Sequence, residues 1–562
     1  MAPTPGLLYV TMQPTPSLPP SAFHDWYNNE HGPNRLRLPF CKNGFRYRAL
    51  DLPAGAETGT KELPEWMACY DMTDTAELLS KTYLTLREPS VKTQREKDVM
   101  AKIAVDRKTF DLDTKKVGSK WVELEDPAIS QTVENVLVAV TTTVEMSNLE
   151  AFKKWHSESH IPALSSLAGW RRTRRYVRSK IEHPGDASEI EVLTLHDFDP
   201  SNGLGGPEHK SIQESAKSDL TSLTKKIVMR KYALSYIFGP CPRYLAPSLS
   251  SWTSTDGLTH THTSPPAISS YITTPDGITL PYRLQGSQNP TAPLIICVNS
   301  ILTTHGIWDA FVASFLSSAE NSKNYRILRY NARGRTSLPS SSTASANQVT
   351  VALLASDVIA ILDALKVAKA AALIGVSLGG ATVLRTALSY PDRVEKFIAC
   401  DTNAFAPPSN PKAWGERIEM CEAEGAVSSS SESDEEEPIV GENLAEATTR
   451  RWFVPESYDG GDMEKETQRV KEMVRSNSLA GFKTGVQALY AYDFRDEMAG
   501  GQVPGAFVVG GGDGVLPKSM EGMARSYGKG GGVFRVVEGA GHLPMVEKPG
   551  EFAGVVGEFL EG

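Results

Sequence analysis

The sequence is poor in cysteine and has no long apolar run. Six cysteines are scattered through 562 residues without paired spacing, and several lie inside apolar runs such as "LIICVNS" and "FIACDT". We therefore expect buried, reduced thiols in a cytoplasmic protein and no disulfide framework. The first residues lack a basic region followed by an apolar core, and no segment approaches a bilayer span, so we expect neither a signal peptide nor a membrane anchor.

An excess of positive charge is also absent. The net charge is −9, part of which comes from the acidic run "SESDEEEP" at 431–438. The densest basic segment, "RRTRRYVRSK" at 171–180, is typical of the exposed face of a strand. These features do not resemble the basic surface of a nucleic-acid-binding protein, so no nucleic-acid partner is expected.

The chain is long enough for roughly three units of ordinary size. Its composition, 40% hydrophobic and 22% charged, is that of a soluble globular protein. Oligomeric state does not follow from these totals.

One sparse pattern occurs twice in the first half of the chain. "FHDWYNNEHGP" begins at Phe23 and "FKKWHSESHIP" at Phe152, and both place Phe, Trp, His and Pro at the same offsets. Around each copy we expect a strand, this helix, two strands, a second helix and a last strand, with the second helix of the first copy running over about 75–103. Both copies, 1–125 and 126–240, thus have the βαββαβ order of a ferredoxin-like fold.

A single sheet of this kind leaves one apolar face uncovered, so the two copies are expected to form an internal pseudo-dimer with their sheets face to face. The motif and the element order resemble the EthD-like family of dimeric α/β-barrels. That resemblance implies binding of small hydrophobic or aromatic molecules and, in some fungal members, dehydration or decarboxylation of polyketides. It makes His31 and His160 candidate functional residues, although packing or helix capping would also explain them.

Residues 241–268 are rich in Pro, Ser and Thr without an apolar period, so they are predicted to be an extended linker. From 269 to 562 strands and helices alternate as in an α/β protein. A helix is expected over about 349–365, with Asp357 and Asp363 on its solvent side. The stretch "AALIGVSLGGATVLRTAL" then has the order strand, sharp turn, helix.

Within that turn Gly375, Ser377 and Gly379 form the G-x-S-x-G pattern of a nucleophile elbow in its required context. The nucleophile sits in a strained turn, and larger side chains two residues on either side would collide with the strand and the helix. Ser377 is therefore the predicted nucleophile. Its partners should follow in the order acid, then histidine.

His542 is the sole histidine after His305 and is the predicted base. Asp513, just beyond an apolar strand, is the predicted acid, and Asp401, which also ends a strand, is the alternative. The backbone N–H groups of Leu378 and of Ile301, in the loop after "LIICV", are predicted to form the oxyanion hole. No metal or other cofactor is expected.

The segments "VNSILTTHGIWDAF", "GVSLGG", "TRRWFVPES", "GGGDGVLP" and "GHLPMVEKP" occur in the order found in β-ketoadipate (3-oxoadipate) enol-lactonases, which this half resembles. The resemblance implies opening of a cyclic ester through a seryl acyl-enzyme, with Trp308, Trp414 and Trp452 lining the substrate cavity. Packing in the core and lid would also explain these tryptophans. Arg333 is a candidate for binding a substrate carboxylate or, alternatively, for holding its own loop.

Three features depart from the enol-lactonase pattern. The oxyanion loop has Ile301-Leu302-Thr303 where that family commonly carries Gly. Asp401 stands where that family usually carries Asn, and the lid, about 403–495, contains an acidic insertion at about 425–445 that is predicted to be disordered.

The combination predicts a serine hydrolase of the lactonase or esterase type, fused to a module that binds or transforms a polyketide-like compound. Fungal aromatic catabolism or secondary metabolism would fit this pairing. A C–C bond or carboxylester hydrolase with the same triad is one alternative. An EthD-like dehydratase or binding protein with a vestigial hydrolase half is the other.

Overall fold

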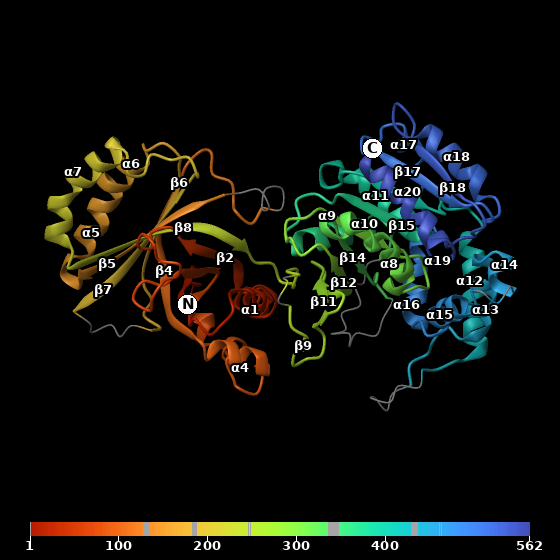
Figure 1. Ribbon diagram of the computed structural model, residues 1–562, viewed down its shortest axis with the longest axis horizontal. Helices are drawn as coiled ribbons and strands as arrows, with labels where there is room; N and C mark the ends of the chain where they lie inside the picture. Colours follow the sequence, from red (N-terminus) through yellow and green to blue (C-terminus); the bar gives the residue numbers. More distant parts are fainter. Residues whose placement is uncertain are drawn as a thin grey trace. The chain divides into compact units, whose positions relative to one another are not determined.

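The computed structural model describes residues 2–126, 134–182, 188–245, 247, 249–334, 348–428, 436–459, 461 and 463–562. The chain divides into two compact units, Met1–Pro242 and Arg243–Gly562 (Figure 1). Every helix within the described ranges is too short or too polar to cross a lipid bilayer.

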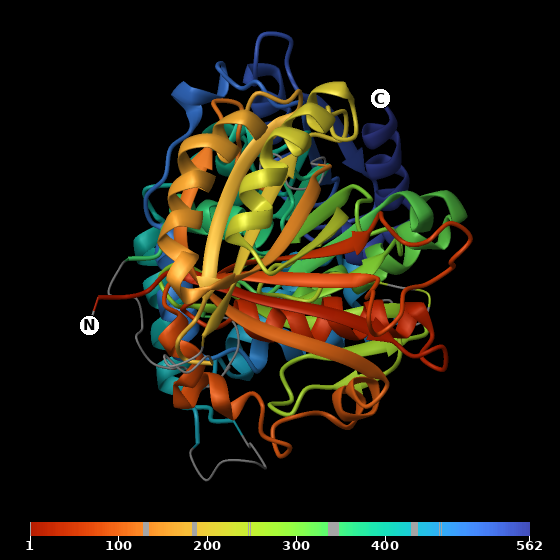
Figure 2. The same cartoon turned by 90° about the vertical axis from the view of Figure 1, so that its left-hand side faces the viewer.

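In the described part of the N-terminal unit the strands close into a barrel, in the order β1-β3-β2-β8-β5-β7-β6-β4 (Figure 2). Each half of the unit contributes four consecutive strands in the same internal order. The pairs β2·β8 and β4·β6 join the halves. The two sheets that were expected to lie face to face are joined at both edges into this one barrel, so no strand edge stays open. The strands are β1 (Gly6–Pro14), β2 (Cys41–Ala49), β3 (Trp66–Met72), β4 (Ile103–Val117), β5 (Val136–Glu145), β6 (Trp170–Arg178), β7 (Glu189–Phe198) and β8 (Lys226–Ile237).

The repeated motif forms the same irregular helix in both halves. A short α-helix runs directly into a π-helical turn that ends on the motif histidine, and a further short helix begins at the next residue. The segments are α1 (Pro20–Trp26), η1 (Tyr27–His31) and α2 (Gly32–Leu36) in the first half, and α5 (Leu149–Trp155), η4 (His156–His160) and α6 (Ile161–Leu164) in the second. Such turns are rare and are frequent at functional sites.

The second helix differs between the halves. In the second half it is one helix, α7 (Pro207–Leu223). In the first half the helix expected over 75–103 is broken into η2 (Thr75–Leu79), α3 (Lys81–Thr85) and α4 (Gln94–Met100). Pro89 lies in the gap between α3 and α4, where its ring would block helix continuation.

The C-terminal unit is built on a ten-stranded sheet in the order β18-β17-β16-β15-β13-β14-β12-β11-β10-β9. Strands β13 to β18 pair in parallel, and β9 to β12 form an antiparallel extension that joins them through β14. The central strands are fully buried, as their continuous apolar runs predict. The strands are β9 (Trp252–Thr253), β10 (His260–Thr263), β11 (Pro266–Thr273), β12 (Thr279–Gly286), β13 (Leu294–Val298), β14 (Arg326–Tyr330), β15 (Ala372–Val376), β16 (Phe397–Cys400), β17 (Gly505–Gly510) and β18 (Val533–Val537).

Helices connect the parallel strands and close the chain. They are η5 (His305–Trp308), α8 (Asp309–Ser317), α9 (Ala319–Asn324), α10 (Val351–Ala364), α11 (Leu378–Ser389), η6 (Pro391–Arg393), α18 (Leu516–Ser526), α19 (Pro544–Glu547) and α20 (Pro549–Glu561).

The segment predicted as a linker, 241–268, differs from that expectation. It contains β9 and β10, which extend the sheet of the C-terminal unit. The alternating Thr and His side chains of β10 fit a strand with one buried face. The alternation is too short to have been recognised as a strand pattern in the sequence.

A helical lid is inserted between β16 and β17. Its elements are α12 (Asn410–Glu424), α13 (Glu442–Trp452), α14 (Pro455–Asp459), α15 (Glu464–Arg475), α16 (Leu479–Gly485), η7 (Val486–Leu489) and α17 (Arg495–Met498). Of the acidic insertion, 429–435 lie outside the described residues. On either side, Val427 pairs with Pro438 and Ile439 with Ser478, so these flanks are ordered, contrary to expectation.

Candidate active site

Ser377 occupies a tight turn between β15 and α11. Its backbone has φ 58° and ψ −118°, a conformation that costs energy for a residue with a side chain. A Cβ added at Gly375 would lie 2.1 Å from the Gly379 carbonyl oxygen, and one at Gly379 would lie 2.2 Å from that of Val298. The two glycines are therefore required by close packing. The turn presents Ser377 at the N-terminus of α11, where the helix dipole favours negative charge.

Asp513 and His542 meet at the ends of two neighbouring strands. Asp513 follows β17 and His542 follows β18. Their side chains are joined by a hydrogen bond of 2.7 Å between His542 Nδ1 and Asp513 Oδ2. Both side chains are largely buried, with 12% and 16% exposed. In the described structure no hydrogen bond joins Ser377 Oγ to His542, and such contacts often tighten only when substrate is bound.

Asp401 lies beside this pair but does not hold the histidine. Its Oδ1 accepts a 2.9 Å hydrogen bond from the Gly510 N–H, and its Oδ2 is buried toward Asp513. Burial and the neighbouring Asp513 charge raise the pKa of the Asp401 carboxyl well above its usual range. Protonation gives the Asp401 carboxyl a hydrogen-bond donor, as an asparagine amide would have. The donor atoms of Asp401, Asp513 and His542 lie within 4.8 Å of one another, and the 2.7 Å contact of His542 with Asp513 is a hydrogen bond.

The raised pKa of Asp401 has a consequence for stability. The folded chain keeps this proton above about pH 4, where the unfolded carboxyl has lost it, so unfolding releases a proton and stability falls as pH rises. The slope is about 1.4 kcal/mol per pH unit until the folded pKa is reached. Asp401→Asn removes this titrating group and, with it, this pH dependence of stability. We expect the melting temperature of the variant, relative to wild type, to increase from pH 5 to pH 8; parallel curves in calorimetry would contradict the assignment.

The backbone N–H groups of Ile301 and Leu378 are available for an anion. Leu378 is the first residue of α11, and Ile301 follows β13 in a loop where Leu302 has φ 65°. The elbow abuts the end of that strand, because a Cβ at Gly379 would also lie 2.6 Å from the Asn299 carbonyl oxygen. Within the described ranges neither N–H has a hydrogen-bond acceptor. An oxyanion hole needs two such backbone N–H groups without acceptors in the protein.

The three predicted cavity tryptophans have different surroundings. Trp452, the last residue of α13, stacks on His542 at 5.7 Å between ring centroids, and its carbonyl accepts the His542 N–H at 2.7 Å. Trp414 packs against Phe482 and under the Arg417 guanidinium. Trp308 is fully buried against Phe311 and Phe552, which makes it a core residue and not the cavity residue predicted.

The guanidinium of Arg333 is bound by two carboxylates of the protein. Its guanidinium donates to both carboxylate oxygens of Asp357, at 2.6 Å each, and to both of Asp276, at 2.6 and 2.9 Å. The candidate role in carboxylate binding is therefore wrong, and the alternative of holding the loop is correct. Asp357 is buried, not solvent-facing as predicted, because Arg333 compensates its charge. Arg335 lies outside the described residues.

Arg333→Ala should destabilise the C-terminal unit by about 3–5 kcal/mol, because it leaves Asp357 buried without a cation. Arg385→Ala is the matched control. Arg385 forms an equally bidentate pair with Glu497, whose side chain is half exposed, so its loss should cost about 1 kcal/mol or less. Urea unfolding of both variants measures the difference, and equal losses would refute the structural role of Arg333.

Sequence reasoning missed Glu547. Its buried carboxylate accepts the Gly541 N–H at 2.6 Å and the Val454 N–H at 3.0 Å, and so ties the loop that carries His542 to the lid segment after Trp452. The one available signal was an acid within the apolar stretch "LPMVEKP".

His31 and His160, the N-terminal candidates, both end a π-helical turn, but they have different partners. His31 Nδ1 is 2.9 Å from Glu96 Oε1, and His160 stacks on Trp155.

Known proteins resemble the C-terminal unit. The model of the "Alpha/beta hydrolase family" matches residues 295–555. A 3-oxoadipate enol-lactonase of Acinetobacter baylyi is 27% identical over 291 residues, 52% of this chain and 96% of the relative. A zearalenone hydrolase of Bionectria ochroleuca is 32% identical over 125 residues, which are 22% of this chain and 44% of the relative. The crystal structure of the enol-lactonase from Burkholderia xenovorans is 28% identical, covers 50% of this chain and 97% of its own, and has a TM-score of 0.42.

The sheet order and the strained serine turn agree with this family match and support the α/β-hydrolase fold for the C-terminal unit. Together with the sequence similarity to an enol-lactonase, this match is consistent with a hydrolase.

Proposed function

We propose that the C-terminal unit opens a lactone, enol-lactone or related ester through an acyl-enzyme. The observation that carries this proposal is the 2.7 Å His542–Asp513 hydrogen bond at the same strand ends that expose Ser377 in its strained turn. Asp513 accepts the proton of Nδ1, which leaves Nε2 of His542 as the base. Ser377, Asp513 and His542 then act as nucleophile, acid and base.

In the first step His542 Nε2 takes the Ser377 hydroxyl proton while Oγ bonds to the ester carbonyl carbon. The negative charge on the former carbonyl oxygen accepts hydrogen bonds from the Ile301 and Leu378 N–H groups. The ester C–O bond breaks, and His542 returns the proton to the leaving oxygen, which in a lactone stays attached to the acyl chain. A water activated by His542 then cleaves the acyl-serine bond and restores Ser377.

Trp452 is proposed to form one wall of the substrate cavity, since its ring already covers the His542 imidazole. Trp414 would lie farther out in the lid. The N-terminal unit, an EthD-like tandem of ferredoxin-like repeats in this proposal, binds or transforms a hydrophobic or aromatic compound. The two units would act in the cytoplasm, in fungal aromatic catabolism or secondary metabolism.

The test is hydrolysis of 3-oxoadipate enol-lactone by the full chain, compared with an acyclic p-nitrophenyl ester and a C–C-cleavable β-diketone. Faster turnover of the lactone, in kcat/KM, supports the proposal. Preference for the acyclic ester or the diketone would assign a carboxylester or C–C hydrolase to the same residues, and no turnover of any of them would point to a vestigial site.

A further inference from the structure

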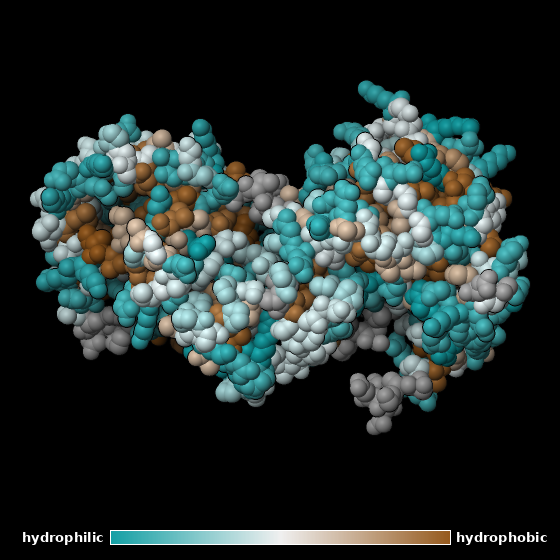
Figure 3. All heavy atoms as spheres, viewed as in Figure 1, coloured by the Kyte–Doolittle hydropathy of each residue, from teal (hydrophilic) through white to brown (hydrophobic). Residues whose placement is uncertain are grey.

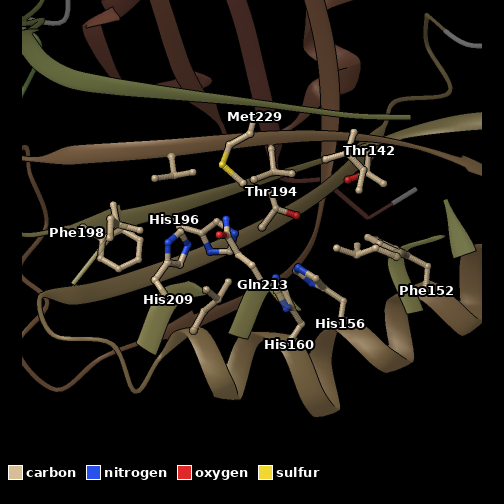
Figure 4. Close-up of a pocket in the computed structure, with 16 residues that line it drawn as sticks. Thr142, Phe152, His156, His160, Thr194, His196, Phe198, His209, Gln213 and Met229 are labelled. Atoms are coloured by element: carbon tan, nitrogen blue, oxygen red, sulfur yellow. The ribbon is translucent and has the colours of Figure 1, made fainter. Parts of the chain in front are cut away.

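A cavity of about 200 Å³ lies between the sheet and the helices in the second half of the N-terminal unit (Figure 4). Much of its wall is apolar and comes from Val138, Val140, Phe198, Leu220 and Met229. Its polar groups are mainly imidazoles. Figure 4 shows His156 and His160 projecting from the helix toward the sheet, with His196, His209 and Gln213 near them. None of the described lining residues is Lys, Arg, Asp or Glu.

The first half fills the equivalent layer with side chains. Tyr27 and Tyr70 both stack on Phe238, with ring centroids 5.5 and 5.7 Å apart, and all three rings are buried in one continuous cluster. Its motif histidine, His31, is held by buried Glu96. In the second half the corresponding core is split into two small clusters with the cavity between their helix and sheet residues. The duplicated halves have therefore diverged, and one of them retains an open site.

Buried Arg175 fixes the tautomer of His156. The guanidinium donates to His156 Nδ1 at 3.2 Å, and arginine can only donate. Nδ1 must therefore be the unprotonated nitrogen, and the proton of this neutral ring is on Nε2. Arg175 is itself oriented by Asp113 and by the Lys153 carbonyl oxygen. The Nε2–H of His156 is the one polar hydrogen that the ring can offer to the cavity.

His209 is fixed in the same way. The Gly205 backbone N–H donates to His209 Nδ1 at 3.0 Å, so its proton too is on Nε2. Among described residues the side chains of His160 and Gln213 have no hydrogen-bond partner, although both line the cavity. The site thus offers two oriented N–H donors and two polar side chains without partners.

The imidazoles are uncharged near neutral pH. Burial lowers the pKa of His160 to about 4 and that of His196 to about 3, and it lowers the pKa of His156 well below its usual value. An anionic ligand would meet no cation in this cavity, and a cationic ligand would meet no carboxylate. Desolvation would then oppose either charge.

We propose that the second half alone binds a neutral, hydrophobic ring compound whose carbonyl or hydroxyl oxygen accepts hydrogen bonds from Nε2–H of His156 and His209. This assignment rests on the binding role proposed for the N-terminal unit and specifies its site, its single copy and the charge of its ligand. Burial of the ring against the apolar wall supplies most of the affinity, and the two donors orient the oxygen.

The cavity opens beside an apolar stretch of β8. Ile227 and Met229 line it and are 41% and 50% exposed. Figure 3 shows apolar surface in the region of β5 and β8 of the N-terminal unit. Met229 is thus at the mouth, where a larger side chain would obstruct entry without disturbing a packed core.

The test is calorimetric titration of the full-length Ser377→Ala chain with 1-tetralone, a neutral bicyclic ketone, with 1-naphthoate as the anion of similar size. Since the nucleophile is absent, failure of the hydrolase proposal does not affect the result. We expect one tetralone per chain and naphthoate bound at least about 10-fold more weakly. His156→Phe keeps the ring and removes the donor, and should weaken tetralone binding about 10-fold.

Met229→Trp should abolish tetralone binding, whereas Val105→Trp, at an exposed position of β4 in the first half, should leave it unchanged. These two exposed substitutions keep the test valid if His156→Phe fails to fold. The proposal is overturned if tetralone does not bind, if naphthoate binds as tightly, if two molecules bind per chain, or if the two tryptophan variants behave alike.

Discussion

Ser377→Ala should lower kcat for ester or lactone hydrolysis about 10⁴-fold or more, the largest effect expected from any single change in this chain. The substitution removes the atom that forms the acyl-enzyme. His542, Asp513 and the two N–H donors remain in place, so a small residual rate over water should persist. Ser377 is half-buried in a strained turn, and its backbone conformation costs alanine about as much as serine. The substitution should therefore leave the stability of the fold nearly unchanged.

Ser389→Ala is the control for that experiment. Ser389 is exposed at the last turn of the same helix, α11, far along the chain from the elbow. Its replacement should leave kcat within about 2-fold of wild type. Equal activity of Ser377→Ala and Ser389→Ala would exclude Ser377 as the nucleophile.

The second large effect separates the two candidate acids. Asp513→Asn should reduce kcat about 10³–10⁴-fold, because an amide N–H facing His542 Nδ1 favours the wrong tautomer. Asp401→Asn should change kcat by less than about 5-fold, since the asparagine can still accept from the Gly510 N–H and His542 is held by Asp513 instead. Initial rates of both variants at one pH decide between them. The reverse order would make Asp401 the acid.

Much of the C-terminal site could be predicted because its chemistry imposes local sequence rules. Gly375 and Gly379 are dictated by contacts about the Ser377 turn, and an acid and a histidine follow successive parallel strands whose carboxyl ends meet at one edge. The observed contact of Asp513 with His542 agrees with the preferred pair. The catalytic roles of these residues remain predictions.

Other features depend on partners distant in sequence. The partners of Arg333 could not be predicted, because Asp276 lies 57 residues before it and Asp357 24 residues after it, and neither spacing signals an ion pair. The role of Trp308 stayed open because a buried tryptophan and a cavity tryptophan have the same local pattern. The linker prediction failed because β9 and β10 owe their structure to pairing with β11, not to their own composition.

The difference between the N-terminal halves was also hidden in the sequence. Both carry the same motif, so His31 and His160 had equal weight. The structure separates them through Glu96, Tyr27, Tyr70 and Phe238 in one half and a cavity with three further histidines in the other. The two halves differ in the residues that pack around the motif histidine, and the motif itself does not include those residues.

The most direct test of the central claim is covalent labelling by a fluorophosphonate, followed by mass analysis of the peptide that carries residue 377. Wild-type protein should be modified at Ser377, and His542→Ala should react far more slowly because the hydroxyl is no longer activated. Failure of the wild-type chain to react, or modification that persists unchanged in Ser377→Ala, would contradict a Ser377 nucleophile activated by His542 and Asp513.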